Sequence, residues 1–130
     1  LKARFSIPMM KKGRLIPSMM KTSFLNSYPE HIPAKNPEEK KLKVAIFIGC
    51  LGNYNYEGIG KSLVEILEYL NIEVFIPKEQ QCCGAPAYFT GAVDSVERMT
   101  KKNIEYFESF MEEYDAMLIP EATCSAMVTH

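Results

Sequence analysis

Residues 44–50 read Val44-Ala45-Ile46-Phe47-Ile48-Gly49-Cys50 and indicate the type of fold that this chain adopts. Five consecutive apolar residues predict a strand that is buried on both faces, and the glycine marks its end. Two further short apolar runs, at 72–76 and 116–119, predict two more strands, which Pro77 and Pro120 close. Three short buried strands are typical of a sheet that is covered by other elements.

Helical patterns separate these strands. After a polar loop, the apolar residues that recur at helical spacing are Ile59, Leu63, Ile66, Leu67 and Leu70. They predict a helix from Glu57 to Tyr69. Further on, Asp94-Ser95-Val96-Glu97 has the form of a capping box with Asp94 as the cap. A mostly apolar stripe then predicts a long helix, and its members are Val96, Met99, Asn103, Tyr106, Phe107, Phe110 and Tyr114. Another helix is expected from Ser125 onward.

The order strand, helix, strand, helix, strand predicts parallel strands joined by right-handed crossovers. We therefore expect an α/β fold, a three-layer parallel βαβαβ sheet with helices on its faces. In such sheets, binding sites form beyond the carboxyl ends of the strands.

Residues 1–42 differ in composition from residues 43–130. The first part holds nine basic and three acidic residues, five of the eight prolines and two methionine pairs, whereas the second holds six basic and thirteen acidic residues. So many prolines are incompatible with long regular elements. We expect residues 1–42 to be a basic, proline-rich extended linker, with one short helix near Leu15 to Leu25 that docks onto a neighbour through apolar side chains. A contact with anionic lipid is the alternative.

The length of 130 residues allows one domain at most. The apolar runs are far shorter than the roughly 18 residues that a membrane span needs, and no signal-peptide pattern opens the chain. We expect a cytoplasmic protein, peripheral at the inner membrane face if it meets a membrane at all. Because the sequence opens on Leu1, we expect it to be part of a longer polypeptide.

The four cysteines follow the three predicted strands. Cys50 comes after the first strand, Cys82 and Cys83 after the second, and Cys124 after the third. Since the carboxyl ends of parallel strands meet at one edge of a sheet, we expect the four thiols to gather there. In a reducing compartment, clustered cysteines are more often metal ligands than disulfides. The alternative, that they are small buried apolar residues, does not explain their corresponding positions.

Thiolates bind iron-sulfur clusters and zinc, and four of them match the ligand number of either. Consecutive side chains diverge, so Cys82 and Cys83 reach two irons of a cluster more easily than one ion. The two-residue spacing common in zinc sites is absent here. We therefore favour a cluster, with zinc as the alternative. Backbone amides of Gly49, Gly52 and Gly84 are expected to donate hydrogen bonds to sulfur, which would tune the cluster potential.

Three segments together resemble the CCG family of cysteine-rich modules, which is of the heterodisulfide-reductase B type. They are Phe47-Ile48-Gly49-Cys50, Cys82-Cys83-Gly84-Ala85-Pro86 and Glu121-Ala122-Thr123-Cys124-Ser125-Ala126-Met127, and the resemblance covers residues 43–130. The family includes iron-sulfur subunits of lactate and glycolate oxidases and of anaerobic glycerol-3-phosphate dehydrogenase, and E-type subunits of succinate dehydrogenases and fumarate reductases.

The resemblance implies that residues 43–130 form the first of two such modules. It also implies a 4Fe-4S cluster that serves electron transfer in a multi-subunit oxidoreductase. The partners would be a flavoprotein dehydrogenase subunit and other iron-sulfur domains, and we expect no nucleic-acid partner. The chain would then be a subunit or fragment of an oxidoreductase rather than a complete catalyst.

The sequence departs from the family at one position. A full motif has five cysteines and ends in Cys-x-x-Cys; Cys124 matches the last of these, and Glu121 stands where the other is expected. Five cysteines hold a non-cubane 4Fe-4S cluster in heterodisulfide reductase. With four, the alternatives are an ordinary cubane, a cluster with one iron open or bound by Glu121, or zinc. A solvated Glu121 at a strand end is the interpretation that we favour.

Two other features carry little weight. Residues 55–62 end in Gly60-Lys61-Ser62, as a phosphate-binding loop does, but the first required glycine is Asn55. We therefore expect no nucleotide site and place Lys61 on the exposed face of a helix. His31 and His130 show no metal-ligand spacing, and we expect both to be solvated.

Three functions remain open at this point. The first is an iron-sulfur electron-transfer module. The second is a disulfide reductase that acts at an open cluster site, and the third is a structural zinc module.

Overall fold

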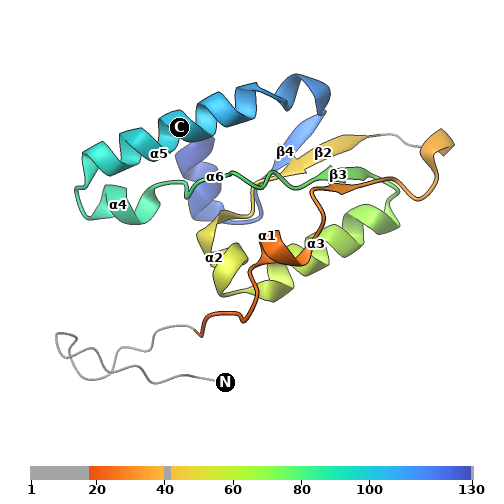
Figure 1. Ribbon diagram of the computed structural model, residues 1–130, viewed down its shortest axis with the longest axis horizontal. Helices are drawn as coiled ribbons and strands as arrows, with labels where there is room; N and C mark the ends of the chain where they lie inside the picture. Colours follow the sequence, from red (N-terminus) through yellow and green to blue (C-terminus); the bar gives the residue numbers. More distant parts are fainter. Residues whose placement is uncertain (1–17, 40–41, 130) are drawn as a thin grey trace.

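The computed structural model describes residues 18–39 and 42–129, and a mainly parallel sheet runs through their centre (Figure 1). Its strands are β1 (His31–Ile32), β2 (Lys43–Ile46), β3 (Glu73–Phe75) and β4 (Ala116–Leu118), in the order β1-β3-β2-β4. β2 pairs in parallel with both β3 and β4, which confirms the three predicted strands and their direction. β1 was not predicted; it pairs antiparallel with β3 and forms one edge.

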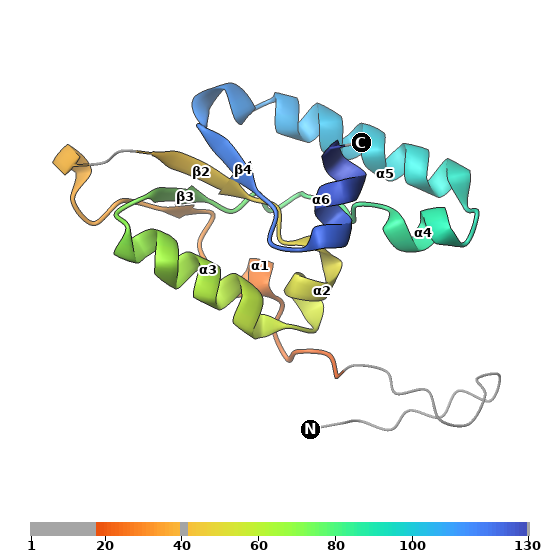
Figure 2. The ribbon, with the colours of Figure 1, turned by 180° about the vertical axis from the view of Figure 1, so that it is seen from behind.

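Helices cover both faces of the sheet. They are α1 (Phe24–Ser27), α2 (Gly49–Tyr54), α3 (Glu57–Tyr69), α4 (Ala85–Phe89), α5 (Val93–Glu108) and α6 (Ala122–Thr129), with short 3-10 turns at Pro37–Glu39 and Met111–Glu113. α5 lies on one face, and α1, α2 and α3 lie on the other (Figures 1 and 2). The α/β class and the three layers are therefore confirmed, and α3 has the predicted bounds.

Three helix boundaries differ from the predictions. α5 begins at Val93 with Ala92 as its cap, so the capping box at Asp94 is wrong: Gly91 turns the chain with a φ of 78°, and the carbonyl of Ala92 already accepts the first helical hydrogen bonds. The same helix ends at Glu108 instead of reaching Tyr114. The polar loop expected after the first strand is a helix, α2, and the last helix starts at Ala122 rather than Ser125.

Alternate residues of the first predicted strand build two cores, one on each face of the sheet. The core under α3 contains the buried side chains of Phe24, Val44, Ile46, Ile48, Val64, Leu67, Val74 and Ile76. The core under α5 centres on Phe47, whose ring meets the edge of the Phe107 ring at a centroid distance of 5.6 Å. Cys83 and Cys124 belong to this second core, so the packing of the sheet continues directly into the cysteine region.

The described part of the predicted linker packs against this same sheet. Phe24 is 1% exposed and lies against Gly60 of α3, where a side chain would collide with its ring. The short helix therefore spans Phe24–Ser27 rather than Leu15 to Leu25, of which residues 15–17 lie outside the described part. Its docking site is the module and not a neighbour, whereas a boundary at residue 42 stays a prediction.

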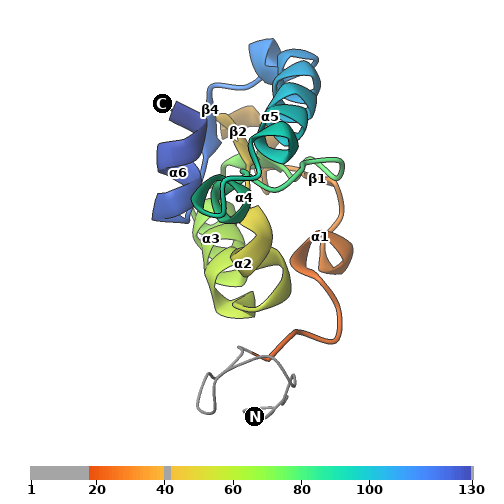
Figure 3. The same ribbon diagram turned by 90° about the vertical axis from the view of Figure 1, so that its left-hand side faces the viewer.

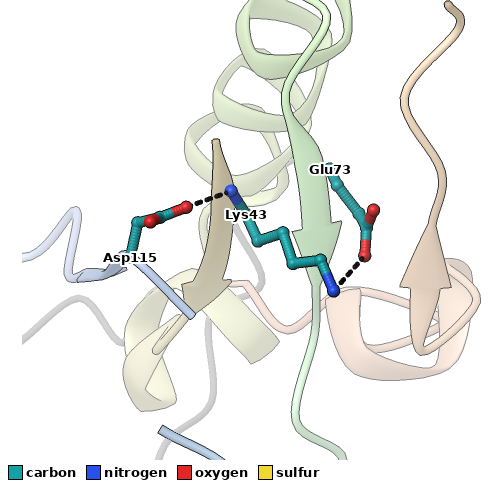
Figure 4. Close-up of polar contacts among 3 residues, drawn as sticks. All are labelled: Lys43, Glu73 and Asp115. Atoms are coloured by element: carbon teal, nitrogen blue, oxygen red, sulfur yellow. Dashed lines mark hydrogen bonds and ion pairs between the residues drawn. The ribbon is translucent and has the colours of Figure 1, made fainter. Parts of the chain in front are cut away.

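The amino ends of the three parallel strands are tied together by polar contacts (Figure 4). The backbone N–H of Lys43 donates to Oδ2 of Asp115 at 2.7 Å, and Lys43 Nζ lies 3.6 Å from Oε1 of Glu73. These contacts link β2 to β3 and to the start of β4. They lie at the amino ends of the strands, opposite to the edge at which the cysteines follow the carboxyl ends.

The remaining expectations concern exposed residues. Lys61 is exposed on α3, as predicted. His31 is exposed too, as predicted; it lies in β1, and its ring stacks on Phe75 at 4.8 Å. His130 lies outside the described residues.

No helix within residues 18–39 and 42–129 combines the length and the apolar composition that crossing a membrane requires.

Candidate metal centre

The carboxyl ends of the parallel strands lead into α2, α4 and α6, which lie together at one edge of the molecule (Figure 3). Cys50 is in the first turn of α2, Cys82 and Cys83 lie just before α4, and Cys124 is in the first turn of α6. The structure thus brings the four predicted residues to the same edge, each from the end of a strand or its following turn.

The four thiols interact with one another. Cys50 lies close enough to both Cys82 and Cys83 for these thiols to raise its pKa. Cys124 lies close enough to Cys83 for that thiol to raise its pKa in the same way. All four cysteines are free thiols. Cys83 therefore lies within reach of both Cys50 and Cys124, and the four thiols form one connected group at this edge.

Burial distinguishes the two sides of the site. Cys83 and Cys124 are 6% and 4% exposed, whereas Cys50 and Cys82 are half-buried. Burial raises the pKa of the Cys124 thiol well above its ordinary value, and the neighbouring Cys83 and Glu121 raise it further. Metal-free, this thiol therefore keeps its proton. A bound cation would reverse that preference because it stabilises thiolate.

The pKa of the Cys50 thiol is also raised, but one backbone hydrogen bond opposes the increase. Burial is the largest cause that raises its pKa, and the nearby Cys82 and Cys83 add to the effect. A hydrogen bond from the backbone of Leu51 acts the other way and lowers the pKa. One amide of α2 thus already favours negative charge on this sulfur, as amides at a helix start do.

The three glycines near the cysteines lie where a side chain would not fit or where the backbone angle favours glycine. Gly49 has a φ of 70°, and a Cβ on it would lie 2.7 Å from Sγ of Cys124, so a side chain would push that thiol away. Gly84 has a φ of 88° and caps α4. Gly52 is buried and would meet Ile48 at 3.0 Å. These contacts explain the three glycines by space and backbone angle, and hydrogen bonds from their amides to sulfur stay a prediction.

Glu121 is half-buried and caps α6, which corrects the interpretation of a solvated residue at a strand end. Its Oε2 accepts a hydrogen bond from the backbone N–H of Cys124 at 2.8 Å, and its carbonyl accepts from the N–H of Ser125. The cap starts the helix at Ala122 and sets the position of Cys124. Whether Glu121 also binds metal stays a prediction.

Gln80 was missed by the sequence analysis. Its Oε1 accepts from the backbone N–H of Ile48 at 2.9 Å, and its Nε2 donates to the carbonyls of Ile46 and Pro77 at 3.1 and 2.8 Å. One amide side chain therefore joins the chain before Cys50 to the chain before Cys82. Nothing in the local sequence pattern distinguishes this glutamine from its neighbour Gln81.

Asn103, in α5, holds the backbone of the segment that leads to Cys82. It is 6% exposed; its Oδ1 accepts from the N–H of Gln81 at 2.7 Å, and its Nδ2 donates to the carbonyls of Gln81 and Cys82, both at 3.3 Å. A buried amide with all its partners fixes the segment that it holds. The sequence could have indicated this role, because Asn103 is the polar member of an otherwise mostly apolar helical stripe.

Two cavities flank Cys50. One, of about 220 Å³, is lined by Cys50, Cys83, Cys124 and Glu121 with apolar neighbours such as Phe89. The other, of about 300 Å³, is lined by Cys50 and Cys82 with polar neighbours that include Lys78 and Gln80. Four thiols that converge beside open space fit a thiolate-bound metal group. Among the described residues, no three Cys, His, Asp or Glu side chains surround one common ion position.

The fold and the converging thiols define a cysteine-rich α/β module. The family model of the CCG cysteine-rich domain matches residues 44–129, and the chain belongs to that family. This confirms the resemblance that the three cysteine segments suggested.

Several curated relatives share this region. The chain is 45% identical over 87 residues to lactate utilization protein A 1 of Bacillus mycoides. The aligned region covers 67% of the chain and 34% of that relative. It is 39% identical over 85 residues to lactate utilization protein A of an Exiguobacterium species, and the aligned region covers 65% of the chain and 34% of that relative. It is 38% identical over 98 residues to an uncharacterized iron-sulfur protein of Methanococcus maripaludis, and the aligned region covers 75% of the chain and 19% of that relative.

The chain therefore spans about a third or less of the length of these relatives. No solved structure matches it.

Proposed function

We propose that this chain is an iron-sulfur electron-transfer module of a multi-component oxidoreductase, with a 4Fe-4S cluster held by Cys50, Cys82, Cys83 and Cys124. The observation that carries the proposal is the convergence of the four cysteines at one sheet edge, where they line two cavities that share Cys50. Such a cluster accepts and releases single electrons at a potential that its protein surroundings set.

The divergence of the consecutive cysteines favours a cluster over zinc. Structural zinc needs its ligands at about 2.3 Å from one point. Here no three Cys, His, Asp or Glu side chains of the described residues surround one ion position, so ligands spread over several metal atoms suit the geometry better. The names of the relatives agree, since one of them is called an iron-sulfur protein.

The chain supports such a group in three ways. The thiols of Cys83 and Cys124 lie in the core under α5, where they are shielded from water. Gln80 holds the chain just before α2, which carries Cys50, and Asn103 holds the loop that carries Cys82. Glu121 orients the first turn of α6, which places Cys124. Each of these contacts fixes a ligand before metal arrives, and such preorganisation strengthens binding.

The larger assembly is inferred from the relatives. Two of them are named for lactate utilization, which suggests a small organic acid as the substrate of the complex. A flavoprotein dehydrogenase subunit would oxidise that acid and pass electrons to this module and to other iron-sulfur domains. The site of action would be the cytoplasm, at the inner membrane face if the complex meets a membrane.

The test is anaerobic reconstitution of the chain with iron and sulfide. We expect broad visible absorption, about four irons and four sulfides per chain, and loss of both in Cys→Ser variants of the four cysteines. Electron paramagnetic resonance of the reduced protein would distinguish a cubane from a non-cubane cluster. One zinc per chain without sulfide or colour would overturn the proposal.

One observation favours a second function, a disulfide reductase. The cavity beside Cys50, Cys83 and Cys124 has exposed apolar walls, including Phe89, and could admit a small disulfide next to the cluster. A change in the spectrum of the oxidised cluster on addition of a thiol would support this function. An unchanged spectrum would leave electron relay as the function.

A further inference from the structure

Lys78 lies beside the cysteine site although it plays no part in the CCG motif. It follows β3 after the buried residues Ile76 and Pro77, and it lines the polar cavity together with Cys50 and Cys82. Of the described residues that line the two cavities next to the thiols, Lys78 is the one with a basic side chain. It therefore brings a positive charge to the side of the site where two cysteines are half-buried.

The ammonium group is held by neutral partners. Nζ donates to the carbonyl of Leu25 and, at 2.6 Å, to the carbonyl of Tyr28. An ammonium has three N–H donors, so these contacts use two of them. Burial lowers the pKa of Lys78, and the more distant Glu30 partly restores it. Among residues 18–39 and 42–129 no carboxylate forms an ion pair with Lys78, so the two carbonyls compensate this partly desolvated charge less than a carboxylate would.

The metal-loaded site would supply the missing negative charge. Four thiolates make the group that they bind more negative, and reduction adds a further negative charge. Because a fixed cation attracts negative charge, it stabilises the reduced form more than the oxidised form.

We infer that the Lys78 ammonium is the electrostatic partner of the metal-thiolate group on its Cys50 and Cys82 side, where it raises the reduction potential. The inference rests on the proposed function. It also gives a role to residues that precede the family match at 44–129, because Leu25 and Tyr28 hold the ammonium in position. The N-terminal segment 18–39 would thus contribute to the electronic properties of the site.

The first test uses the metal-free chain. The rates at which iodoacetate, an anion, and iodoacetamide, which is neutral, alkylate each cysteine are measured by mass spectrometry. Their ratio reports the local electrostatic potential and cancels the thiolate fraction. In Lys78→Gln, which loses the charge but keeps N–H donors, the ratio should fall about threefold at Cys50 and Cys82 and little at Cys124.

Two variants complete the comparison. Lys78→Arg should restore the ratio because it keeps the charge, and Lys61→Gln, on the exposed face of α3, should leave it unchanged. An unchanged ratio in Lys78→Gln, or an equal fall at all four cysteines, would overturn the inference. If Lys78→Gln does not fold, the native chain suffices: its ratio at Cys50 and Cys82 should fall with rising salt, and a ratio independent of salt would be contrary to the inference.

The second test uses the reconstituted protein. Its reduction potential should be lower in Lys78→Gln than in the native chain and should recover in Lys78→Arg. Equal potentials in all three would overturn the inference. A chain that binds no iron would overturn the proposed function instead, and the alkylation ratio of the metal-free chain would still test the charge of Lys78.

Discussion

The side-chain amide of Asn103 donates a hydrogen bond to the carbonyl oxygen of Cys82 across 21 residues of sequence. The same side chain bonds the N–H and carbonyl of Gln81, so α5 holds the segment that leads to the Cys-Cys-Gly turn. The ligand geometry of the candidate site is thus linked to the stability of a helix on the face of the sheet.

Replacing Asn103 should therefore weaken both the fold and the site. Asn103→Leu leaves one backbone N–H and two carbonyls without their partner, and we expect a loss of about 2–3 kcal/mol in the free energy of unfolding, measured with urea. Equal stability of Asn103→Leu and the native chain would contradict a positioning role.

Gly49 offers a test of the space around Cys124. Gly49→Ala places a Cβ at 2.7 Å from Sγ of Cys124 and forces an unfavourable φ, so it should lower the iron content after reconstitution and cost about 1–3 kcal/mol. Gly91→Ala is the matched control for the backbone angle, since its φ is 78° but nothing lies within 4 Å.

A second control has neither constraint. Gly58, in α3, has open space around its Cβ position, so Gly58→Ala should be neutral or slightly stabilising. If Gly49→Ala loses no more iron than Gly91→Ala, the contact with Cys124 does not matter for loading.

Two substitutions of Glu121 distinguish its role as a helix cap from a role as a metal ligand. Glu121→Gln keeps a side-chain oxygen that can accept from the N–H of Cys124, whereas Glu121→Ala removes the cap and should cost about 1 kcal/mol. If Glu121 acts through the cap alone, the Gln variant should keep the native stability and the spectrum of the reconstituted protein. A spectrum altered in Glu121→Gln at native stability would indicate that the carboxylate binds iron.

The N-terminal segment should contribute measurably to stability. Phe24 is 1% exposed in the core under α3, and Phe24→Ala should lower the free energy of unfolding by about 3–5 kcal/mol. Met19, which is 72% exposed, provides the control, and Met19→Ala should change stability by less than about 0.5 kcal/mol. A small effect of Phe24→Ala would mean that residues 18–39 are dispensable for the fold.

The metal-free chain should become less stable in alkali. The pKa values of Cys50 and Cys124 are raised above the ordinary value of 9.0, so the folded chain binds these protons more tightly than the unfolded chain. Stability from this source is complete below pH 9 and is lost as pH rises beyond it. Tyr28, Tyr106 and Tyr114, whose pKa values are also raised, act in the same direction.

Urea titrations at pH 7.5 and 10 measure this loss. Cys124→Ala removes one thiol and should show a smaller decrease between the two pH values than the native chain does, because the tyrosines remain. An equal decrease in both proteins would argue against a thiol contribution.

The sequence alone determined the strand positions, the bounds of α3 and the edge at which the cysteines meet. These features depend on apolar runs, helical spacing and the residues that end strands, all of which act over a few neighbouring positions. The parallel direction followed from the alternation of strands and helices, and that direction places Cys50, Cys82, Cys83 and Cys124 at one edge.

The tertiary structure alone decided which side chains surround those cysteines. Asn103 reaches Gln81 across 22 residues, Gln80 reaches Ile48 across 32, and Lys78 reaches Leu25 across 53. The edge strand β1 and the burial of Phe24 likewise depend on partners far away in sequence. No local pattern records such pairs, because each hydrogen bond or packing contact forms only when the sheet brings distant segments within a few ångströms of one another.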